Sequence, residues 1–570
     1  MGQNACSCCA EERNEIAEKD FGALPAPVHF QEDLREPAQA TDDCDMPSPF
    51  CEDDATQGPA HTKLSGLASA TLISPGRSSP SRAEVLGSTS PLRRVPTRED
   101  RLEQGAQLYV DSELVRSISL ESTLWGCGWL WRVRPAQMSQ AQLDALWRRS
   151  AEADAFDVFL SHAWSTPGHQ KYLSLLLSSG WQYALLAWAF AATLVMTLYI
   201  LNVLPRPMTV SRNEDLLASG EARMAPWGYL STFVFALSGL ACAPHMCSSW
   251  RRTPGCFYDV ACVNQGDPEQ RERGIYGIGG FLAITKQLRI LWSPPYLSRL
   301  WCVFEVAAYR KANPNGQLKL QPVFVERTIL LAWISMFLFM GIFMFLRLSR
   351  LPVAVGVCAF YPGAHIVRRG YQQQEQMFRS LAEFDLNSMS CTNDFDQRFI
   401  LSAVCQWYGS LEGFTDYVRG PLKEELTQSV VLARVPLQYC ILIASPIAGF
   451  QLDTVASFLN AGASSDVVVR VILANLLAMP TMAVCVIYYF FWLCQRFARP
   501  CFSSCAMDYA QTAMVLCLFG LGLLPFAAVV RALAEGLAAT LAAAGVSLAM
   551  FVVLLVQLHS FRCSRIFGRR

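Results

Sequence analysis

Apolar and polar stretches alternate along the chain, and the apolar ones are long. Eight of them run for about twenty residues without any Asp, Glu, Lys or Arg, the length that an α-helix needs to cross the hydrocarbon of a bilayer. The pattern therefore predicts a multi-pass integral membrane protein surrounded by the lipid bilayer. The eight segments cover residues 181–204, 226–243, 328–346, 351–367, 435–452, 471–494, 509–530 and 537–558.

The charges between these segments predict an orientation. The loop 451–466 has no Lys or Arg, whereas the next loop carries Arg496 and Arg499 and the tail 559–570 is basic. Because cytosolic loops carry an excess of Lys and Arg, both termini are predicted to lie in the cytosol. An even number of spans satisfies this orientation, although the two arginines of 347–350 then face outward.

The fourth segment, 351–367, is the weakest of the eight. It is short and contains Pro352, Pro362 and His365. A re-entrant helix is the alternative to a full span there.

The composition agrees with a membrane protein, since 52% of the residues are hydrophobic and only 16% are charged. The 47 basic and 47 acidic residues cancel, so no nucleic-acid partner is expected. The 21 cysteines are scattered, without the paired spacing of a zinc site or a disulfide framework. Cys242, His245 and Cys247 lack a second ligand pair, so no metal site is predicted.

The first 105 residues are rich in Pro, Ser, Asp and Glu, a composition that predicts a disordered tail. Gly2 suits myristoylation, and the thiols of Cys6, Cys8 and Cys9 are candidates for palmitoylation. Two acyl groups would hold this end at a cytosolic leaflet. Alternatively, these are unmodified residues of the tail.

Residues 106–153 form a small element with a cluster of tryptophans. Ser139 and Gln142 have the spacing of a capping box and predict a helix over 139–149. We expect this element to pack against the segment that follows it.

Short strand and helix patterns alternate in the polar parts of the chain. This order predicts a parallel sheet with helices on both faces. The expected elements are strands at 156–163, 256–259, 288–292 and 318–325, helices at 168–179 and 271–286, and a polar loop at 263–270.

The apolar segments 181–204 and 226–243 interrupt this α/β unit after its first helix. Strands cannot pair across a bilayer, so an insertion must return the chain to the side where it started. Two spans do so, whereas one or three would not.

The α/β unit resembles the Toll/interleukin-1 receptor (TIR) domain. The opening strand FDVFLSHA at 156–163 and the run SPPYLSRLWCVFE at 293–305 are similar to TIR landmarks and occur in the same order. The resemblance covers 154–180 and 251–327, and it implies a flavodoxin-like parallel sheet. The rest of the chain divides into a transmembrane hairpin insertion at 181–243, a transmembrane pair at 328–367, a cytosolic helical segment at 368–434 that covers the sheet from the side, and four transmembrane helices at 435–558.

The resemblance implies two functions. TIR domains signal by associating with other TIR domains, including copies of themselves. Some TIR domains instead cleave NAD with a glutamate that corresponds to Glu305, so NAD is a candidate substrate and no cofactor is required. A carboxylate beside the ribose stabilises an oxocarbenium-like transition state. Ser161, Asp259 and Trp301 are the expected neighbours of the ligand.

Plainer interpretations stand beside this one. Glu305 is alternatively a solvated helix residue, Trp301 a core residue, and Asp259, Asn264 and Gln265 ordinary turn residues. A third function is a transporter or channel regulated by the TIR-like domain. Transport generally places ionisable residues deep in the membrane, and none is evident inside the eight segments.

Overall fold

The computed structural model describes residues 86–87, 108–211, 216, 221–246, 253–345, 352–389, 391, 393–431, 435–501 and 504–567, without the side chains of 86–87, 211, 352–359, 387, 428–431 and 559–567. All of them belong to one unit of the chain, Gly76–Arg570. Apart from β1 (Leu86–Gly87), which pairs with β2 (Val110–Asp111), the predicted tail lies outside the described residues. So do Gly2, Cys6, Cys8 and Cys9.

Strands from distant parts of the sequence form one six-stranded sheet in the order β10-β9-β5-β8-β3-β4. Its four parallel strands are β5 (Phe156–His162), β8 (Gly255–Phe257), β9 (Thr285–Trp292) and β10 (Gln317–Pro322). Phe159 lies opposite Leu288 on one side and Phe257 on the other. The predicted parallel sheet is therefore confirmed, and strands on both sides of the insertion are neighbours in it. In sequence order the parallel strands run 2-1-3-4, as in flavodoxin-like sheets.

The Trp-rich element adds the antiparallel edge of this sheet, which the sequence did not predict. β3 (Arg116–Ser119) pairs with β8, and β4 (Ala151–Glu152) pairs with β3. Strands of two to four residues carry too little alternation to be recognised from sequence. The capping box is confirmed, because Ser139 N donates to Gln142 Oε1 at 2.9 Å at the start of α5 (Gln140–Trp147).

Two predicted boundaries are corrected. The expected helix over 271–286 is two helices, α9 (Pro268–Tyr276) and α10 (Ile278–Ala283), which meet at Gly277. A Cβ on Gly280 would lie 2.3 Å from the carbonyl carbon of Tyr109, so the glycine lets α10 approach that backbone closely. β10 ends at Pro322 rather than at residue 325, and α12 (Val323–Phe345) begins directly after it.

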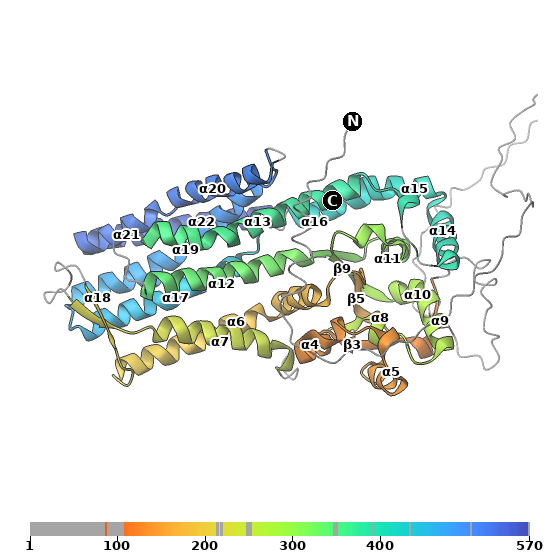
Figure 1. Cartoon of the computed structure of the whole chain (residues 1–570), viewed down its shortest axis with the longest axis horizontal. Helices are drawn as coiled ribbons and strands as arrows, with labels where there is room; N and C mark the ends of the chain where they lie inside the picture. The colour runs from red at the N-terminus through yellow and green to blue at the C-terminus, as the bar shows by residue number, and fades with distance from the viewer. Residues whose placement is uncertain are drawn as a thin grey trace, which may run out of the picture. The chain divides into compact units, whose positions relative to one another are not determined.

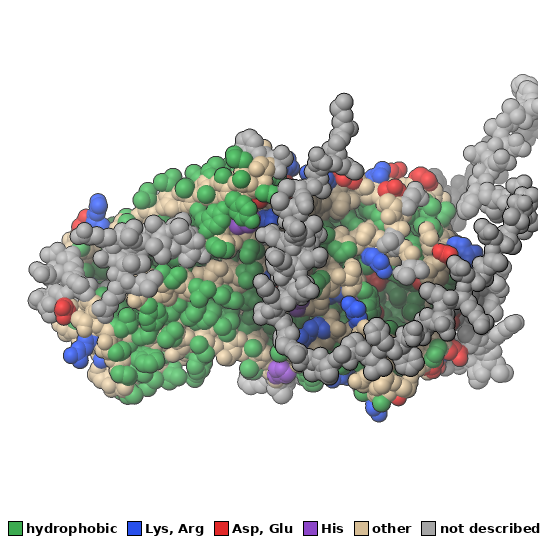
Figure 2. All heavy atoms as spheres, in the orientation of Figure 1, with side chains coloured by type: hydrophobic (Ala, Val, Ile, Leu, Met, Phe, Trp, Pro, Cys, Tyr) green, Lys and Arg blue, Asp and Glu red, His purple; other side chains and the backbone are tan. Residues whose placement is uncertain are grey.

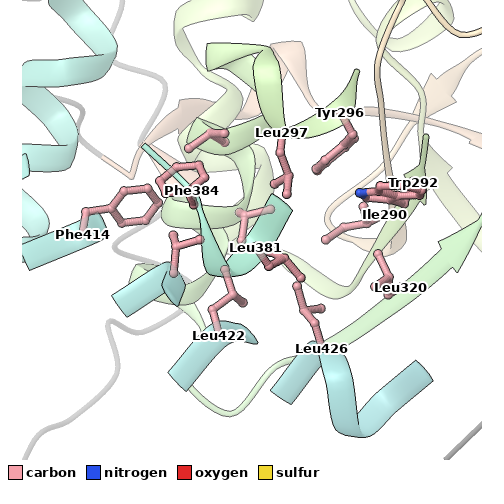
Figure 3. A pocket seen from close by; sticks show the side chains of 13 residues that line it. Ile290, Trp292, Tyr296, Leu297, Leu320, Leu381, Phe384, Phe414, Leu422 and Leu426 are labelled. Carbon is pink, nitrogen blue, oxygen red and sulfur yellow. The ribbon is translucent and has the colours of Figure 1, made fainter. Parts of the chain in front are cut away.

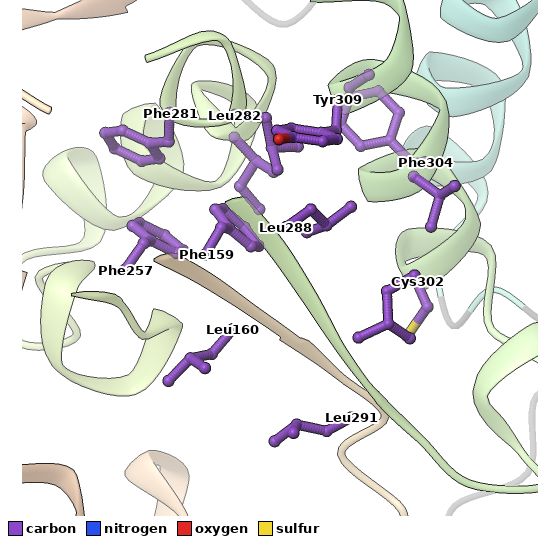
Figure 4. Packing of buried hydrophobic residues seen from close by; sticks show 14 of the residues in the cluster. Phe159, Leu160, Phe257, Phe281, Leu282, Leu288, Leu291, Cys302, Phe304 and Tyr309 are labelled. Atoms are coloured by element: carbon purple, nitrogen blue, oxygen red, sulfur yellow. The ribbon is translucent and has the colours of Figure 1, made fainter. Parts of the chain in front are cut away.

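Aromatic and aliphatic side chains fill the space between the sheet and its helices. The rings of Phe159 and Phe257 stack with their centroids 4.5 Å apart, and Phe281 of α10 lies against Phe257 (Figure 4). Each such side chain contributes roughly 1.5–3 kcal/mol when it is fully buried. The opposite side of α11 (Leu300–Ala312) packs on the helical segment predicted at 368–434, which belongs to the same core. This segment comprises the end of α13 (Pro352–Ala382), α14 (Asp394–Tyr408), α15 (Leu411–Tyr417), a π-helical turn (Val418–Leu422) and α16 (Lys423–Val431).

The first helix of the sheet unit and the first membrane segment are a single helix, α6 (Gly168–Ile200). The sequence pattern had predicted two separate elements, a helix at 168–179 and a membrane segment at 181–204, on either side of Gly180. The helix runs through this glycine, which packs closely on α7 (Trp227–Cys242): an added Cβ would lie 3.0 Å from Leu240 Cδ1 and 2.9 Å from the Cβ of Ala243, the residue after α7. Figure 1 shows α6 and α12 leading from the sheet strands into the long helices. A hairpin of β6 (Met208–Ser211) and β7 (Glu221–Met224) joins α6 to α7.

Seven helices in the described part of the chain are long and apolar enough to cross a membrane. They correspond to seven of the eight predicted segments, and Figure 2 shows hydrophobic side chains gathered over them on the face in view. The weak segment 351–367 overlaps α13, which is not among the seven. The seven candidate spans are Gly168–Ile200, Trp227–His245, Val323–Phe345, Leu437–Asn460, Ser465–Arg496, Cys505–Glu535 and Leu537–Leu558.

Several of these spans are composite or irregular. Ser465–Arg496 contains α18 (Ser465–Ile472), a π-helical turn (Leu473–Ala478) and α19 (Met479–Arg496). Cys505–Glu535 contains α20 (Cys505–Leu521) and α21 (Leu524–Glu535), and α22 (Leu537–Phe567) follows.

The carboxylate of Asp453 lies inside a candidate membrane span, because this helix is longer than the predicted segment 435–452. α17 (Leu437–Asn460) continues past the predicted end at residue 452 and includes Asp453, whose side chain is buried. This carboxylate accepts hydrogen bonds from the backbone N–H groups of Gly228 and Tyr229 at 2.7 and 2.8 Å and from the Tyr199 hydroxyl at 2.7 Å. It thus satisfies donors that the first turn of α7 leaves free.

Arg368 of α13, which is fully buried, forms an ion pair with Asp508 at the start of α20. In the sequence, Asp508 directly precedes the predicted membrane segment 509–530. In the structure Arg368 also donates to Thr512 Oγ1 at 3.0 Å and to the Asp508 carbonyl at 2.9 Å. Gln511 donates to the carbonyls of Phe497 and Arg499 at 2.9 and 2.8 Å and so fixes the loop before α20. The side chains of Arg368 and Gln511 therefore form their hydrogen bonds within the protein.

Gly449→Ala tests the close packing of α7 on α17. The added Cβ would lie 2.4 Å from Thr232 Oγ1 and 3.3 Å from the Gly228 carbonyl, both buried. We expect the free energy of unfolding to fall by about 1–3 kcal/mol, seen as a lower Tm in one detergent. Gly520→Ala is the control, because nothing lies within 4 Å of its Cβ and alanine favours a helix. Equal Tm values for the two variants would contradict the packing.

Candidate functional site

The carboxyl ends of the parallel strands meet at one edge of the sheet, the edge where doubly wound sheets bind ligands. Ser161 and His162 end β5, Asp259 follows β8, and Ser293 follows β9. Glu305 reaches this edge from the second turn of α11. We call these five residues the carboxyl-edge site.

Glu305 is partly buried and points into the sheet edge rather than into bulk water. Ser161 Oγ donates a hydrogen bond to Glu305 Oε2 and lies 2.5 Å from the Tyr296 hydroxyl. Tyr296 OH in turn donates to the carbonyl of Cys302 at 3.3 Å. The loop before α11 therefore holds both the serine and the carboxyl group in place.

Burial sets the protonation of the site. It raises the pKa of Glu305 to about 8, with the Ser161 hydrogen bond opposing this shift and the nearby Asp259 charge adding to it. Burial, together with Lys171, lowers the pKa of His162 to about 4. At neutral pH the carboxyl group is thus mostly protonated and the imidazole is neutral. A protonated carboxyl can donate a proton as a general acid, whereas charge stabilisation requires its ionised form.

Asp259 brings the loops after β5 and β8 together. Its Oδ2 accepts a hydrogen bond from Trp164 Nε1 at 2.8 Å, and its Oδ1 lies 3.8 Å from His162 Nε2. The edge of the Trp131 ring packs against His162 with a centroid distance of 5.4 Å. The structure therefore brings Ser161, Asp259 and Glu305 to one edge.

Trp301 faces α14. Its indole N–H donates to Asp396 Oδ2 of α14 at 3.2 Å, and its ring lies 5.4 Å from that of Phe304. Trp301 thus fixes α11 against α14, and its predicted contact with a ligand stays a prediction.

Three polar groups of this edge were not singled out from the sequence. Thr166 Oγ1 lies 2.5 Å from Ser293 Oγ and joins the loops after β5 and β9. Lys171, on the first turn of α6, is only 3% exposed. Tyr296 belongs to the motif at 293–305, but its hydroxyl contact with Ser161 depends on residues 135 positions apart. The sequence offered little to identify these three residues as part of a site. Tyr296 lies in the motif at 293–305, and Lys171 lies on the first helical turn after the turn that follows β5.

A cavity between the sheet and the helices of the segment 368–434 is too small to hold a ligand. Figure 3 shows Ile290, Trp292 and Leu381 around it, and all thirteen lining residues are hydrophobic. Its volume is about 20 Å³, room for about one water molecule. Within the described ranges, no three His, Cys, Asp or Glu side chains are grouped to hold a metal ion.

Comparisons with known proteins do not place this chain in a family. No family model, no curated protein and no solved structure matches it. Its function is therefore argued from its own residues.

Glu305→Gln tests the protonation of the site through stability. The folded pKa of Glu305, about 8, lies above the ordinary pKa of a glutamate, 4.5, so the folded state holds a proton that the unfolded state releases. Its stabilising effect is complete below pH 4.5 and is lost as the pH rises to 8. The Tm of the variant relative to the parent should thus increase from pH 5 to pH 8 and then level off.

Glu412→Gln on the exposed surface of α15 is the matched control. Its Tm should follow that of the parent across this pH range. A Tm difference between Glu305→Gln and the parent that does not change with pH would contradict the raised pKa.

Proposed function

We propose that this chain is a membrane-integrated signalling protein whose TIR-like unit lies in the cytosol and acts by associating with the same unit of another copy. With α13 as an eighth crossing beside the seven candidate spans, both termini lie in the cytosol. The observation that carries the proposal is the direct passage of the sheet into the membrane bundle. β10 continues without a loop into α12, and α6 follows β5 after a five-residue turn, 163–167. A rearrangement of either helix in the bilayer would move the sheet unit with it.

A buried polar network fixes this junction. Glu326 on the first turn of α12 accepts hydrogen bonds from Ser174 Oγ of α6 at 2.9 Å and from the Tyr439 hydroxyl of α17 at 3.5 Å. Gln321 at the end of β10 donates to Ser174 Oγ at 2.8 Å and to Ser178 Oγ at 3.1 Å. Three membrane helices and one strand are thus tied together by groups that lose their partners if the helices separate.

The predicted loop at 263–270 is shorter in the structure, because α9 begins at Pro268, and together with the start of α9 it offers a preformed surface for association. Asp267, the N-cap of α9, accepts the backbone N–H of Glu269 at 2.9 Å, and Asn264 Oδ1 accepts that of Gly266 at 3.1 Å. Pro268 and Glu269, the first two residues of α9, are exposed and form the tip of this surface. A surface fixed by its own hydrogen bonds loses little conformational entropy on binding.

Reversing one charge at this tip tests the association. We expect Glu269→Arg to reduce energy transfer between donor-labelled and acceptor-labelled copies of the full chain in vesicles, because the new charge opposes the complementary surface. Glu412→Arg, an equally simple reversal on the exposed surface of α15, should leave the transfer unchanged. Transfer no higher than between copies in separate vesicles would remove the proposal, and equal loss in both variants would exclude this loop.

A second candidate function, NAD hydrolysis, is favoured by the contact between Glu305 and Ser161 at the carboxyl edge. In this reaction the bond between ribose and nicotinamide breaks, neutral nicotinamide leaves with the bonding electrons, and water adds to the ribose and releases a proton. An ionised Glu305 would stabilise the cationic sugar. Because burial raises the pKa of Glu305 to about 8, the rate should increase as the pH approaches 8.

Loss of NAD over time with the purified full chain checks this candidate. We expect Glu305→Gln to consume NAD at least about tenfold more slowly than the parent, and Glu412→Gln to match the parent. If the parent consumes none, or if Glu305→Gln is as fast as the parent, the enzyme assignment fails while the signalling proposal stands.

Transport gains no such support. The buried charged groups of the described bundle are hydrogen-bonded to neighbouring helices and loops; they include Glu326, Arg368, Asp453 and Arg470. Groups held in this way fix helix packing rather than mark a path for a solute.

A further inference from the structure

Two tryptophans beside the membrane bundle are exposed. Trp125, on α4 (Leu120–Gly128), is 48% exposed, and Trp129, the first residue of the short helix Trp129–Trp131, is 40% exposed. The backbone between them is not helical, with φ of +59° at Gly126 and +53° at Cys127. Large aromatic side chains that stay exposed together mark an interaction surface more often than scattered single residues do.

Two exposed arginines flank these rings. The Arg149 guanidinium lies 5.2 Å above the centre of the Trp129 ring, and Arg132 donates to the Cys127 carbonyl at 3.0 Å. Both side chains remain accessible to solvent. We call Trp125, Trp129, Arg132 and Arg149 the Trp–Arg surface.

This surface adjoins the end of a membrane span. Trp125 Nε1 donates to the Pro244 carbonyl at 2.7 Å, and its ring stacks on His245 at a centroid distance of 6.1 Å. Pro244 and His245 are among the last residues of the candidate span Trp227–His245. Figure 1 shows α4 beside the end of α7. The surface is therefore continuous with the boundary between lipid and water.

The depth of this surface follows from its contacts with α6. A Cβ on Gly128 would lie 2.3 Å from the Tyr172 ring of α6, whereas Gly180 of α6 faces Ala243, directly after α7. The eight residues from Tyr172 to Gly180 correspond to about 12 Å along the helix at 1.5 Å per residue. The headgroup region adds roughly 5–8 Å to each side of the hydrocarbon, so Trp125, which contacts Pro244 and His245, lies within it, and Gly128 lies about 4 Å beyond it.

We infer that residues 120–132 dock into the headgroup layer on the sheet side of the bilayer, with a preference for anionic lipids. Tryptophan favours this layer because its ring is apolar and its N–H is polar. Guanidinium groups bind lipid phosphates in a bidentate manner. A second attachment of this kind, beside the spans, restricts the tilt of the sheet unit against the membrane, whatever its signalling partner.

Lipid crosslinking tests the docking in the intact protein. The full chain would be placed in nanodiscs of phosphatidylcholine, with or without phosphatidylserine, each containing a lipid with a photoreactive group near its headgroup. We expect adducts on the peptide 120–132, at higher yield with phosphatidylserine. The exposed helix α5, residues 140–147, lies outside the Trp–Arg surface, so it is the internal control and should carry few.

Three variants refine the result. Trp125→Ala with Trp129→Ala should lower the adduct yield on 120–132 several-fold, whereas Trp492→Ala, a 49% exposed tryptophan near the end of α19, should not change it. Arg132→Gln with Arg149→Gln should remove the difference between the two lipid mixtures. The parent protein alone decides the matter if a variant does not fold. Adducts on 120–132 that are no more frequent than on 140–147 overturn the proposal, and so does a yield that the tryptophan changes do not affect.

Discussion

The pairing of β5 with β9 is the interaction on which this structure depends. The two strands are neighbours in a parallel sheet, with Phe159 opposite Leu288, yet two candidate membrane spans lie between them in the sequence. Backbone N–H and C=O groups cannot remain unpaired in lipid, and strands on opposite sides of a bilayer cannot pair. The insertion must therefore cross the membrane an even number of times, and α6 and α7 pack along each other as a hairpin that does so.

The same constraint explains why the sheet unit and the bundle are joined so closely. A strand that has to pair beside the membrane leaves little room for a flexible linker, and β10 passes into α12 without one. The hydrogen bonds of Ser174 with Glu326 and Gln321 then hold α6 and α12 at a fixed distance. At the other end of the hairpin, Asp453 holds α7 against α17. Both ends of the α6–α7 hairpin are thus fixed by buried polar groups, which tolerate separation poorly.

Around the carboxyl edge, burial rather than residue type decides the chemistry. Glu305 is held by Ser161 in a setting that raises its pKa to about 8, so the resting site carries a neutral carboxyl group. Such a group suits a structural hydrogen bond in a signalling domain, and it suits catalysis only if a ligand or an opening of the edge ionises it. Association and NAD hydrolysis consequently make different demands on one residue, although the motif at 293–305 is the same for both.

The sequence by itself determined what depends on local composition. Blocks of apolar residues predicted eight spans, and seven of them correspond to helices long and apolar enough to cross a membrane, because transfer of a helix into hydrocarbon depends on its own side chains. The capping box at Ser139 and the alternation of strands and helices were equally local. Tertiary structure alone decided the strand order, the edge formed by β3 and β4, the fusion of two predicted segments into α6, the place of Asp453 at the start of α7, and the burial of Glu305. Each of these features arises from contacts between residues that are distant in sequence. Such contacts stabilise the structure only after folding has brought the residues together, so local patterns in the sequence do not reveal them.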